Sequence, residues 1–503
     1  MSLSRVAYFE HGVVASEHPL ASSAGADVLK HGGNAFDAAV ATSFVMAVTY
    51  HPAGGLGGDC FAMVYDAKRR KIRCLNSSGW APSGLTVDLL KSNRKRDVPV
   101  VGPYSAMIPG TIAGMAELHK TFGSQPLQRL LAPAAGYAKK GFPVGDSLCR
   151  SIAANLSGLS DAAKRVFAPN ARAPSPGEWL KQEKLGRVIE GVSKDGAKAF
   201  YKGWPAEKIA ERLTELGVET RKSDFSDFKP EWAEPLKLDY NGATVYEAPP
   251  NSMGATSLLM LEFLSKTKLA NARPLSAERM RLTLEAAQFA YGRRDEMIGD
   301  PRFGRFDFQS FMRLGNGSRP PRQRSLRERD TTTFSVVDKE GNIVSVAQSL
   351  FHHFGSRVFV EDCGIMLNSR GAGFVLAGPN KVEPRKRPLH TLSSLILDRG
   401  DGPKLTLGTS GGEYRPVQHT LFVTNIVDYH MTLEQSIDHP RFLWSGGKAV
   451  EVETGYESPA PPGYEVTAGP YPGRAGTCHA VEILHGARKG VCDVRGDGLP
   501  AGH

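Results

Sequence analysis

At Thr331 a polar, basic segment meets a strand pattern that begins with three threonines, and this junction limits the folds open to the chain. Residues 313–330 (RLGNGSRPPRQRSLRERD) are rich in Gly, Pro, Ser and Arg and too poor in apolar residues to form a core element. Residues 331–337 (TTTFSVV) and 343–348 (IVSVAQ) are β-branched or apolar runs joined by a glycine-containing turn at 338–342. The pattern predicts an exposed, flexible linker followed by a β-hairpin.

A threonine at such a junction can serve a specific chemistry. An internal threonine hydroxyl is a poor nucleophile because no adjacent base removes its proton. An N-terminal threonine carries its own α-amine, with a reference pKa of ~7.7–8.0, which can act as the general base. Scission of the Asp330–Thr331 peptide bond would create that amine. Most threonines at strand starts are only good β-formers, so the pattern alone leaves both interpretations open.

The N-terminal third of the chain predicts helices packed on a sheet. Apolar and small residues recur at helical spacing over 20–29 and 35–48, with the sequence HGGN at 31–34 as the break. The glycine-rich segment 52–59 (PAGGLGGD) precedes a strand pattern at 61–65. That segment lacks the ending of a phosphate-binding loop, so we expect tight packing near a site rather than nucleotide binding.

The remaining pattern is also of the α/β class. A turn at 108–111 leads into a helix for which Thr111 or a neighbour is the expected cap, and helical patterns dominate to about residue 300. Strand patterns follow at 357–360, 393–397 and 405–407, with a helix at 416–429.

Composition narrows the function classes. The chain has 503 residues, 41% hydrophobic and 23% charged, and a net charge of +10 that suits small acidic substrates. Much of this charge lies in 91–96 and 313–329 without interleaved aromatic residues, which argues against a nucleic-acid partner. The six cysteines form no CxxC pair, so we expect free buried thiols rather than a metal or redox site. The N-terminal segment has no signal-peptide pattern and no run approaches ~18 apolar residues, so we expect a cytoplasmic protein without membrane contact.

Several segments resemble the gamma-glutamyltransferase superfamily of N-terminal-nucleophile hydrolases. Residues 330–342 (DTTTFSVVDKEGN) resemble the start of the family's small subunit. The resemblance implies an α/β fold, a four-layer αββα sandwich, cut into a large subunit 1–330 and a small subunit 331–503 that form one intertwined domain. These subunits would be each other's partners in a heterodimer, with a dimer of heterodimers as a further assembly. Other blocks match in family order and cover essentially the whole chain: 12–16, 32–41, 57–59, 109–111, 386–389 and 410–412.

The resemblance also implies catalytic roles. Thr331 matches the nucleophile and Ser349 the second hydroxyl that supports it. Gly411 and Gly412 match the backbone donors of the oxyanion hole, each of which contributes roughly 2.7–4 kcal/mol when aimed at the tetrahedral oxyanion. In isolation these two glycines would indicate an ordinary turn. No metal or organic cofactor is implied.

The family's glutamate-binding residues are mostly replaced. Ser78 stands in place of a carboxylate-binding arginine and Phe351 in place of an asparagine. Gly373 replaces the ammonium-binding aspartate, and the paired serines become His390 and Thr391. An ammonium left unpaired in a closed pocket costs several kcal/mol, so we expect a γ-glutamyl donor to bind poorly.

The residues gained instead suit an anionic group without an ammonium. They are Arg370, which can bind a carboxylate bidentately, and His390, with His352 and His353 nearby. Residues 348–356 and 368–372 resemble the oxamate amidohydrolase branch, with cephalosporin acylases as more distant candidates. We therefore expect hydrolysis of a small anionic amide, oxamate-like or an acyl amide, through an acyl-Thr331 intermediate with water as acceptor.

The sequence leaves alternatives open for several of these residues and for the function. Arg370 can be a structural ion-pair partner, and His352 and His353 can be merely packed or solvated. At the level of function, the alternatives are a true gamma-glutamyltransferase or glutathione hydrolase with a rebuilt pocket, and an unprocessed, non-catalytic binding or scaffold protein of the same fold.

Overall fold

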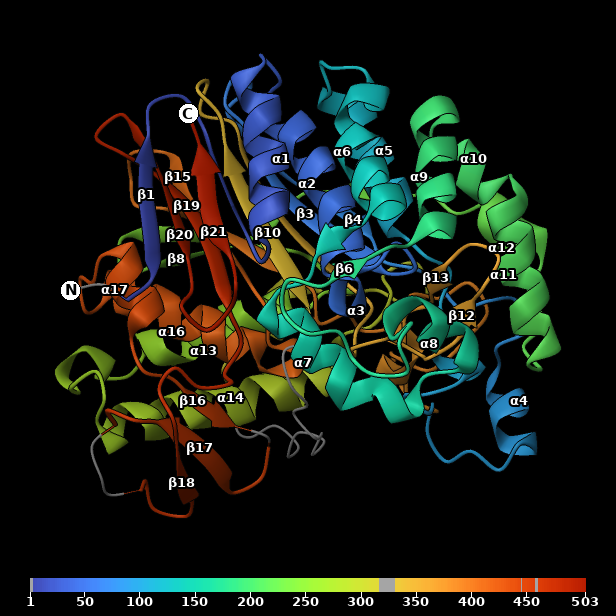
Figure 1. The fold of residues 1–503 in the computed structure, drawn as a ribbon. Helices are drawn as coiled ribbons and strands as arrows, with labels where there is room; N and C mark the ends of the chain where they lie inside the picture. The colour runs from blue at the N-terminus through green and yellow to red at the C-terminus, as the bar shows by residue number, and fades with distance from the viewer. Residues whose placement is uncertain (1–2, 316–330, 445, 457–459) are drawn as a thin grey trace.

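The computed structural model describes residues 3–315, 331–444, 446–456 and 460–503. Two seven-stranded sheets of the described residues lie face to face, and helices cover both outer faces, giving four αββα layers (Figure 1). The expected α/β sandwich is therefore confirmed. Most of the predicted linker 313–330, including Asp330, falls outside the described residues.

One sheet, here called the hairpin sheet, contains the predicted hairpin at its centre. Residues 338–342 connect its two strands as expected, and each strand is buried along its whole length. The neighbours on either side come from the first 80 residues of the chain. The strand order is β21 (Leu499–Gly502), β2 (Val13–Ser16), β10 (Thr332–Val337), β11 (Ile343–Ser349), β3 (Asp59–Asp66), β4 (Lys71–Ser77) and β7 (Glu231–Ala233).

The other sheet, here called the facing sheet, is antiparallel throughout and packs on the hairpin sheet. Its central strands carry the segments 390–393 and 410–412 at one end. The strand order is β1 (Arg5–Phe9), β20 (Ala487–Cys492), β19 (Cys478–Leu484), β15 (Pro403–Thr409), β14 (Ser394–Asp398), β9 (Ala243–Glu247) and β8 (Leu236–Tyr240).

The helix that covers the hairpin is α2 (Ala35–Thr49), and every one of its residues is buried. Asn34 caps it, accepting hydrogen bonds from the backbone N–H groups of Phe36 and Asp37, while the Asp37 side chain accepts from the Asn34 backbone. The helix contacts β10 and β11 directly. Small residues along α2 permit this close approach, as the alanine-rich pattern indicates.

Further helices complete the two outer layers. None of the helices in the described ranges is long and apolar enough to cross a membrane. On the side of the hairpin sheet lie α1 (Pro19–Lys30), α5 (Thr111–Phe122), α6 (Leu127–Lys140) and α9 (Glu183–Asp195). Against the facing sheet lie α13 (Gly254–Ser265) and α16 (Arg415–Val427), and α14 (Ala277–Met297) packs on these two helices.

Helices dominate residues 111–297 as expected, but residues 231–247 interrupt them with β7, β8 and β9, which the sequence analysis did not identify. The expectation for Thr111 is wrong. The hydroxyl of Thr111 does not cap α5, which has Gly110 as its N-cap without a side-chain bond. A Cβ at Gly110 would lie 1.9 Å from the Ser77 carbonyl oxygen. Close packing against Ser77 therefore explains why a glycine, and not a capping side chain, occupies this position.

The two sheets are in close contact beside the start of β10. Thr333 points into the gap between them, because its Oγ1 lies 3.1 Å from His479 Nδ1 on β19. Thr332 points to the opposite, helical face, where a Cβ on Gly54 of α3 (His51–Gly54) would lie 2.5 Å from its Oγ1. Side chains alternate along a strand, so Thr331 is expected on the same face as Thr333.

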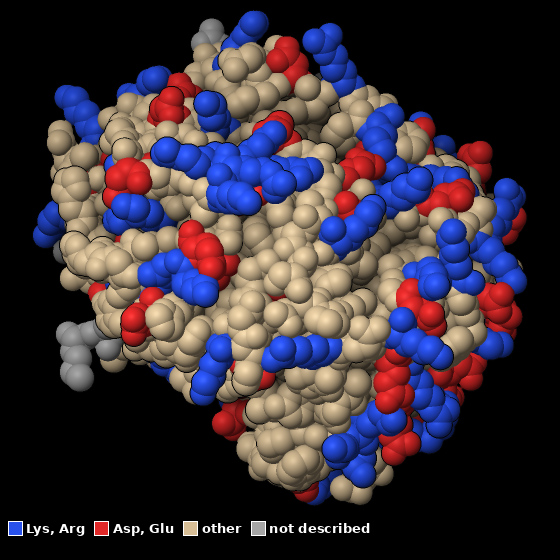
Figure 2. All heavy atoms as spheres, turned by 90° about the horizontal axis from the view of Figure 1, so that it is seen from above, with Lys and Arg blue, Asp and Glu red and all other residues tan. Residues whose placement is uncertain are grey.

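The surface charge is mixed. Figure 2 shows one cluster of Lys and Arg side chains on the face seen from above, with Asp and Glu side chains interspersed over the rest. Exposed pairs such as Lys139–Glu190, at 2.7 Å, contribute little to stability. All six cysteines are buried and free, as expected from their spacing.

The close approach of the sheets gives a stability prediction. A Cβ at Gly408 of β15 would lie 2.9 Å from Thr333 Cβ and 3.1 Å from Ser345 Oγ, both on the hairpin sheet. Gly408→Ala should therefore lower the free energy of unfolding by about 1–3 kcal/mol, because the sheets must move apart. Urea unfolding followed by circular dichroism measures this change.

The matched control is Gly136→Ala in α6, where an added Cβ meets nothing within 4 Å. There alanine should be neutral or stabilising by up to about 1 kcal/mol. Equal unfolding free energies for the two variants would contradict the proposed tight contact at Gly408.

Candidate active site

Four polar side chains stand opposite one another at the ends of four adjacent strands. The register of β10 on β11, extended by one residue, places Thr331 opposite Ser349. Ser349 pairs with Asp59 of β3, and the register of β3 on β4 continues the line to Ser78. Opposed residues of an antiparallel pair point to the same face with Cβ atoms about 4.5–5.5 Å apart. We call Thr331, Ser349, Asp59 and Ser78 the polar row; all four are buried.

The polar row faces the gap between the two sheets. Phe61, two residues after Asp59, packs with Leu392 and Ile396 of the other sheet. At this end the facing sheet presents the segment that enters β14 and the turn that follows β15. The predicted substrate-binding residue His390 and the predicted oxyanion donors therefore lie on the opposite wall from Thr331.

The local structure around Thr331 suits a fixed nucleophile. It directly precedes β10 and is 2% exposed. Ser349 Oγ accepts a hydrogen bond from the Phe351 N–H at 2.8 Å, and Phe351 adopts a left-handed conformation with φ +80°. This bond fixes the Ser349 side chain at the end of β11. Asp330 lies outside the described residues, so cleavage before Thr331 stays a prediction.

Asp59 is the site residue that sequence reasoning missed. Its Oδ1 accepts from the Gly79 N–H at 2.9 Å, and its Oδ2 lies 2.9 Å from His390 Nε2 and 3.7 Å from Arg370 Nε. Burial raises the pKa of Asp59 to about 7, although Arg370 and the backbone donors oppose the rise. The sequence offered one sign of it, a carboxylate placed between a glycine-rich turn and a fully apolar strand.

His390 is held in one tautomer. Its Nδ1 lies 3.2 Å from the Leu392 N–H and must accept that proton, so Nε2 carries the ring proton and donates it to Asp59. Burial and the nearby guanidinium of Arg370 lower the pKa of His390 well below its ordinary value. The imidazole is therefore neutral at neutral pH, and its contribution to the site is a directed hydrogen bond rather than a positive charge.

Arg370 provides the positive charge of the site and is itself well held. Its guanidinium is fully buried, donates from Nη1 to Thr391 Oγ1 at 2.9 Å, and stacks 4.1 Å over the Phe351 ring. Together with the ion pair to Asp59, these contacts make Arg370 both a structural partner and a wall of the site. Thr391 orients the guanidinium plane.

Ser78 belongs to a buried network of amides and hydroxyls. Its Oγ donates to Asn76 Oδ1 at 2.7 Å and accepts from Asn251 Nδ2 at 3.2 Å. Asn251 also donates to the Pro388 carbonyl at 2.5 Å. This network fastens the end of β4 to the segment that carries His390.

The two neighbouring histidines differ in position. The His352 ring lies 4.4 Å from the Phe351 ring, and its backbone N–H lies 3.4 Å from Ser369 Oγ. His353 Nδ1 pairs with Ser151 Oγ of α7 (Asp146–Asn155) at 2.8 Å. His352 thus flanks the wall formed by Arg370 and Phe351, while His353 packs against the helical layer.

Gly411 and Gly412 form a sharp turn between β15 and α16. Both have positive φ, +136° and +53°, conformations that L side chains rarely adopt. Within the described ranges, neither N–H donates to another protein group. The turn leads into the N-terminal end of α16, where the helix dipole favours negative charge. These groups have the chemistry that an oxyanion requires.

A separate cavity lies far from this site. It measures about 560 Å³ and lies at the turn end of the hairpin, where Asp338, Lys339 and Asn342 line it. Gly33 and Asn34, between α1 and α2, also line it. Strand β10 separates it from Thr331 by six residues, which is ~20 Å of extended chain. A small molecule bound there does not reach the polar row.

The chain is similar to known proteins over nearly its full length. The profile of the gamma-glutamyltranspeptidase family matches residues 21–503. The glutathione hydrolase-like YwrD proenzyme of Bacillus subtilis is 35% identical and covers 97% of this chain and 98% of that protein. The oxamate amidohydrolase proenzyme of Klebsiella pneumoniae is 31% identical, with 86% of this chain and 85% of that protein covered. Cephalosporin acylase from Bacillus halodurans superposes with a TM-score of 0.90 at 29% identity, covering 99% and 97% of the two chains.

The raised pKa of Asp59 makes stability depend on pH. Between its unfolded value of 3.8 and its folded value of about 7, the folded state binds the proton more tightly, so stability falls as pH rises through this range. Asp59→Asn removes the titration. The wild-type free energy of unfolding, measured by urea titration, should fall by about 1–3 kcal/mol relative to Asp59→Asn between about pH 5 and about pH 8.

Asp66→Asn at the other end of β3 is the control. Burial tends to raise the pKa of Asp66, but hydrogen bonds from Arg69 outweigh it and leave the pKa lowered. Asp66 is therefore ionised throughout this pH range in both states, and its variant should keep the wild-type pH dependence. If Asp59→Asn keeps it as well, Asp59 does not titrate in this range.

Proposed function

Since the chain belongs to the gamma-glutamyltranspeptidase family of N-terminal-nucleophile hydrolases and acyltransferases, we propose that it is an autoprocessed amidohydrolase that acts on an amide of a small carboxylic acid. The observation that carries the proposal is the position of Thr331. It heads a central strand opposite Ser349, on the face that looks toward the Gly411–Gly412 turn. The family profile and the full-length matches to hydrolases disfavour the alternative of a non-catalytic scaffold.

Processing would divide the chain into residues 1–330 and 331–503. The names of the B. subtilis and K. pneumoniae relatives describe proenzymes, which supports this step. Both sheets contain strands from both segments; in the hairpin sheet β10 and β11 lie between β2 and β3. The two products would therefore stay together as a heterodimer, because separating them would break both sheets.

The proposed cycle starts with the α-amine of Thr331 taking the proton from Oγ as Oγ attacks the amide carbonyl carbon. The N–H groups of Gly411 and Gly412 stabilise the tetrahedral oxyanion, and the Ser349 hydroxyl supports the Thr331 oxygen by hydrogen bonding. The amine then returns the proton to the leaving nitrogen as the C–N bond breaks. Water, deprotonated by the same amine, then attacks the acyl-Thr331 ester. The amine returns this proton to Thr331 Oγ as the ester C–O bond breaks and the acid is released.

The wall around Arg370 supports an anionic acyl group. The guanidinium carries the charge that a carboxylate needs, and Phe351 covers its face. A Cβ at Gly373 would lie 2.8 Å from the Leu389 carbonyl oxygen, so an ammonium-binding aspartate does not fit there without backbone movement. We infer that the substrate is an oxamate-like or short acyl amide whose carboxylate contacts Arg370.

A second candidate is a glutathione hydrolase. The name and full-length match of the B. subtilis YwrD relative favour it. In that case Asp59 would be the carboxylate that a γ-glutamyl ammonium approaches, in competition with Arg370 and His390 for the same oxygen. The partners that already surround Asp59 make this arrangement the less favourable one.

Removal of the nucleophile tests the processing step. Thr331→Ala should leave one uncut band near 54 kDa on a denaturing gel, and the wild type should give two bands. Thr332→Ala is the control, because that side chain faces the helices and bonds to the Gln348 carbonyl at 3.1 Å. Normal cutting of Thr331→Ala would remove Thr331 from the mechanism.

A substrate panel tests the acyl site. Oxamate, glutaryl-p-nitroanilide and γ-glutamyl-p-nitroanilide should be compared by kcat/KM for release of ammonia or amine. We expect an amide without an ammonium to be preferred, and Arg370→Gln to lower its kcat/KM by about 30- to 1,000-fold, because the carboxylate loses its partner.

Arg387→Gln serves as the matched control. Arg387 is also a buried arginine of this region, but it pairs with Glu231 at 2.9 Å on the edge of the hairpin sheet. Its loss should affect stability rather than the preference among amides. Faster turnover of the γ-glutamyl compound, increased by a dipeptide acceptor, would establish the second candidate instead.

A further inference from the structure

Three buried polar side chains project from the first two turns of α16 toward the segment that precedes it. They are Arg415, Gln418 and His419, and each is fully buried. Buried polar groups are costly unless they are hydrogen-bonded, so their clustering beside Gly411 and Gly412 requires an explanation. Their hydrogen-bond partners are Thr409 at the end of β15, Glu247 at the end of β9, and the carbonyl of Ala475.

Arg415 holds the last residue of β15. Its Nε and Nη2 donate to the Thr409 carbonyl oxygen at 2.9 and 2.6 Å. Burial lowers the pKa of Arg415 to about 9, and the guanidinium of Arg370 acts in the same direction while Glu247 opposes it. The chain thus buries a guanidinium to fix one carbonyl two residues before the oxyanion turn.

His419 holds the side chain of the same residue. Its Nε2 lies 3.0 Å from Thr409 Oγ1, and its Nδ1 lies 2.6 Å from Glu247 Oε1. Ser393 Oγ donates to the other oxygen of Glu247. This Glu–His–Thr chain joins β9, α16 and β15, with all three of its side chains fully buried.

The order Glu–His–Thr is that of a hydrolytic triad, but its position excludes that role. Gly408 packs on Thr333 of the hairpin sheet, so the next residue, Thr409, points to the opposite face, toward α16. Its hydroxyl lies on the side of the facing sheet away from Thr331. The chain is placed to orient the turn that follows rather than to attack a substrate.

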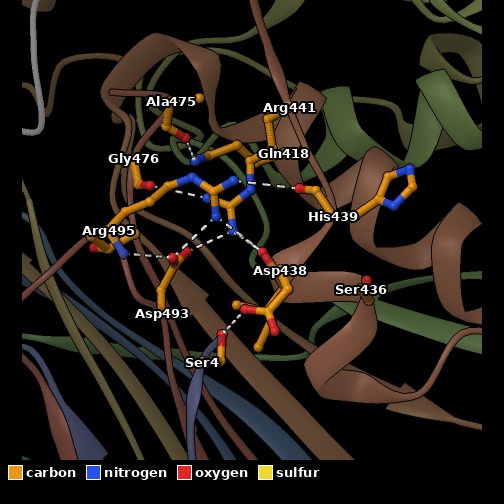
Figure 3. Close-up of polar contacts among 12 residues, drawn as sticks. Ser4, Gln418, Ser436, Asp438, His439, Arg441, Ala475, Gly476, Asp493 and Arg495 are labelled. Carbon is orange, nitrogen blue, oxygen red and sulfur yellow. Dashed lines mark hydrogen bonds and ion pairs between the residues drawn. The ribbon is translucent and has the colours of Figure 1, made fainter. Parts of the chain in front are cut away.

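Gln418 lies between the turn and the segment 475–477, and Figure 3 shows its contact with Ala475. Its Nε2 donates to the Ala475 carbonyl, and a Cβ added at Gly411 would lie 2.6 Å from its Oε1. Arg441 donates to the Gly476 carbonyl at 3.0 Å and pairs with Asp493 at 2.6 Å, as Figure 3 shows. Through Arg441, this ion pair fixes the segment 475–477, to which Gln418 is hydrogen-bonded.

The same segment contacts the turn directly. Thr477 Oγ1 and Ser410 Oγ lie 2.8 Å apart, and the Thr477 N–H donates to Ser410 Oγ at 2.8 Å. Glu17 accepts from Thr477 Oγ1 at 2.8 Å. Hydrogen bonds from Arg415 and His419 therefore fix Thr409, hydrogen bonds with Thr477 fix Ser410, and Gly411 packs closely against Gln418.

We propose that Arg415, Gln418 and the His419–Glu247 pair are positioning residues that aim the N–H groups of Gly411 and Gly412 at the tetrahedral oxyanion. The inference rests on the proposed function, since it assigns these N–H groups to the oxyanion. Donors of this kind act only when they are aimed at the position that the oxyanion will occupy. A rotated turn loses transition-state stabilisation but leaves ground-state binding at Arg370 intact. The result is a lower kcat with little change in KM.

The test removes one hydroxyl of this network. Thr409→Val keeps the side-chain volume and deprives His419 Nε2 of its partner, and Glu247→Gln removes the charge at the other end. We expect each to lower kcat by about 10- to 100-fold with KM within about twofold, and normal cutting at Thr331. Thr409→Ser keeps the hydroxyl and should restore most of the activity.

The matched control is Thr406→Val on the same strand. Thr406 is equally buried and donates to the Leu395 carbonyl at 2.6 Å, but it does not contact the turn. It should lose comparable thermal stability without loss of kcat. Equal loss of kcat in Thr406→Val and Thr409→Val, or a change in KM alone, would overturn the inference.

An assay that does not require knowledge of the natural substrate separates this inference from the proposed function. Wild-type protein mixed with p-nitrophenyl acetate should release a burst of p-nitrophenolate as Thr331 is acylated, and Thr409→Val should slow that burst. A wild-type burst with an unchanged rate in Thr409→Val refutes the positioning role alone. A wild type with neither a burst nor amide turnover refutes the proposed function and this inference together.

Discussion

The structure depends on the antiparallel register of β10 between β2 and β11. That register makes Thr331 the residue opposite Ser349 and continues through Asp59 to Ser78. A shift by one residue would turn every side chain of β10 to the other face and send Thr331 toward the helices. The helical face of the hairpin is apolar, with Phe334, Val336, Val344 and Val346 in one core cluster. The face toward the other sheet carries the hydroxyls of Thr333, Ser335 and Ser345. A shifted register would bury hydroxyl groups in the apolar layer, so this division of the two faces resists the shift. The packing of two sheets thus fixes a hydroxyl in front of the oxyanion turn.

The charges of the site are arranged so that few remain uncompensated. Asp59 and Arg370 are both fully buried, and each partly neutralises the charge of the other. His390 is neutral and donates its one ring N–H to Asp59. Arg370 stacks on Phe351, which removes one face of the guanidinium from solvent. A substrate carboxylate entering this wall meets a cation whose orientation is already set, so little ordering remains to be done on binding.

The sequence predicted the local elements well because they depend on local patterns. The hairpin at 331–348, the break between α1 and α2, and the apolar strand after the glycine-rich segment are all visible within windows of about 15 residues. Asp59 was missed because its role depends on pairing with Ser349, which lies 290 residues later in the chain. The strands β8 and β9 were missed because their alternation is short and lies between long helices. The contacts of His419 and Gln418 could not be predicted from the sequence, because no local pattern distinguishes a buried polar residue of a helix from an exposed one.

The central claim is that Thr331 is both the new N-terminus and the acylated residue. It is tested most directly by acid-quenching the wild-type enzyme during turnover and mapping the covalent acyl adduct by peptide mass spectrometry. The account predicts an adduct on the peptide that begins with Thr331, whose α-amine is free. An adduct on any other residue, or an active protein that remains one continuous chain through 330–331, would contradict it.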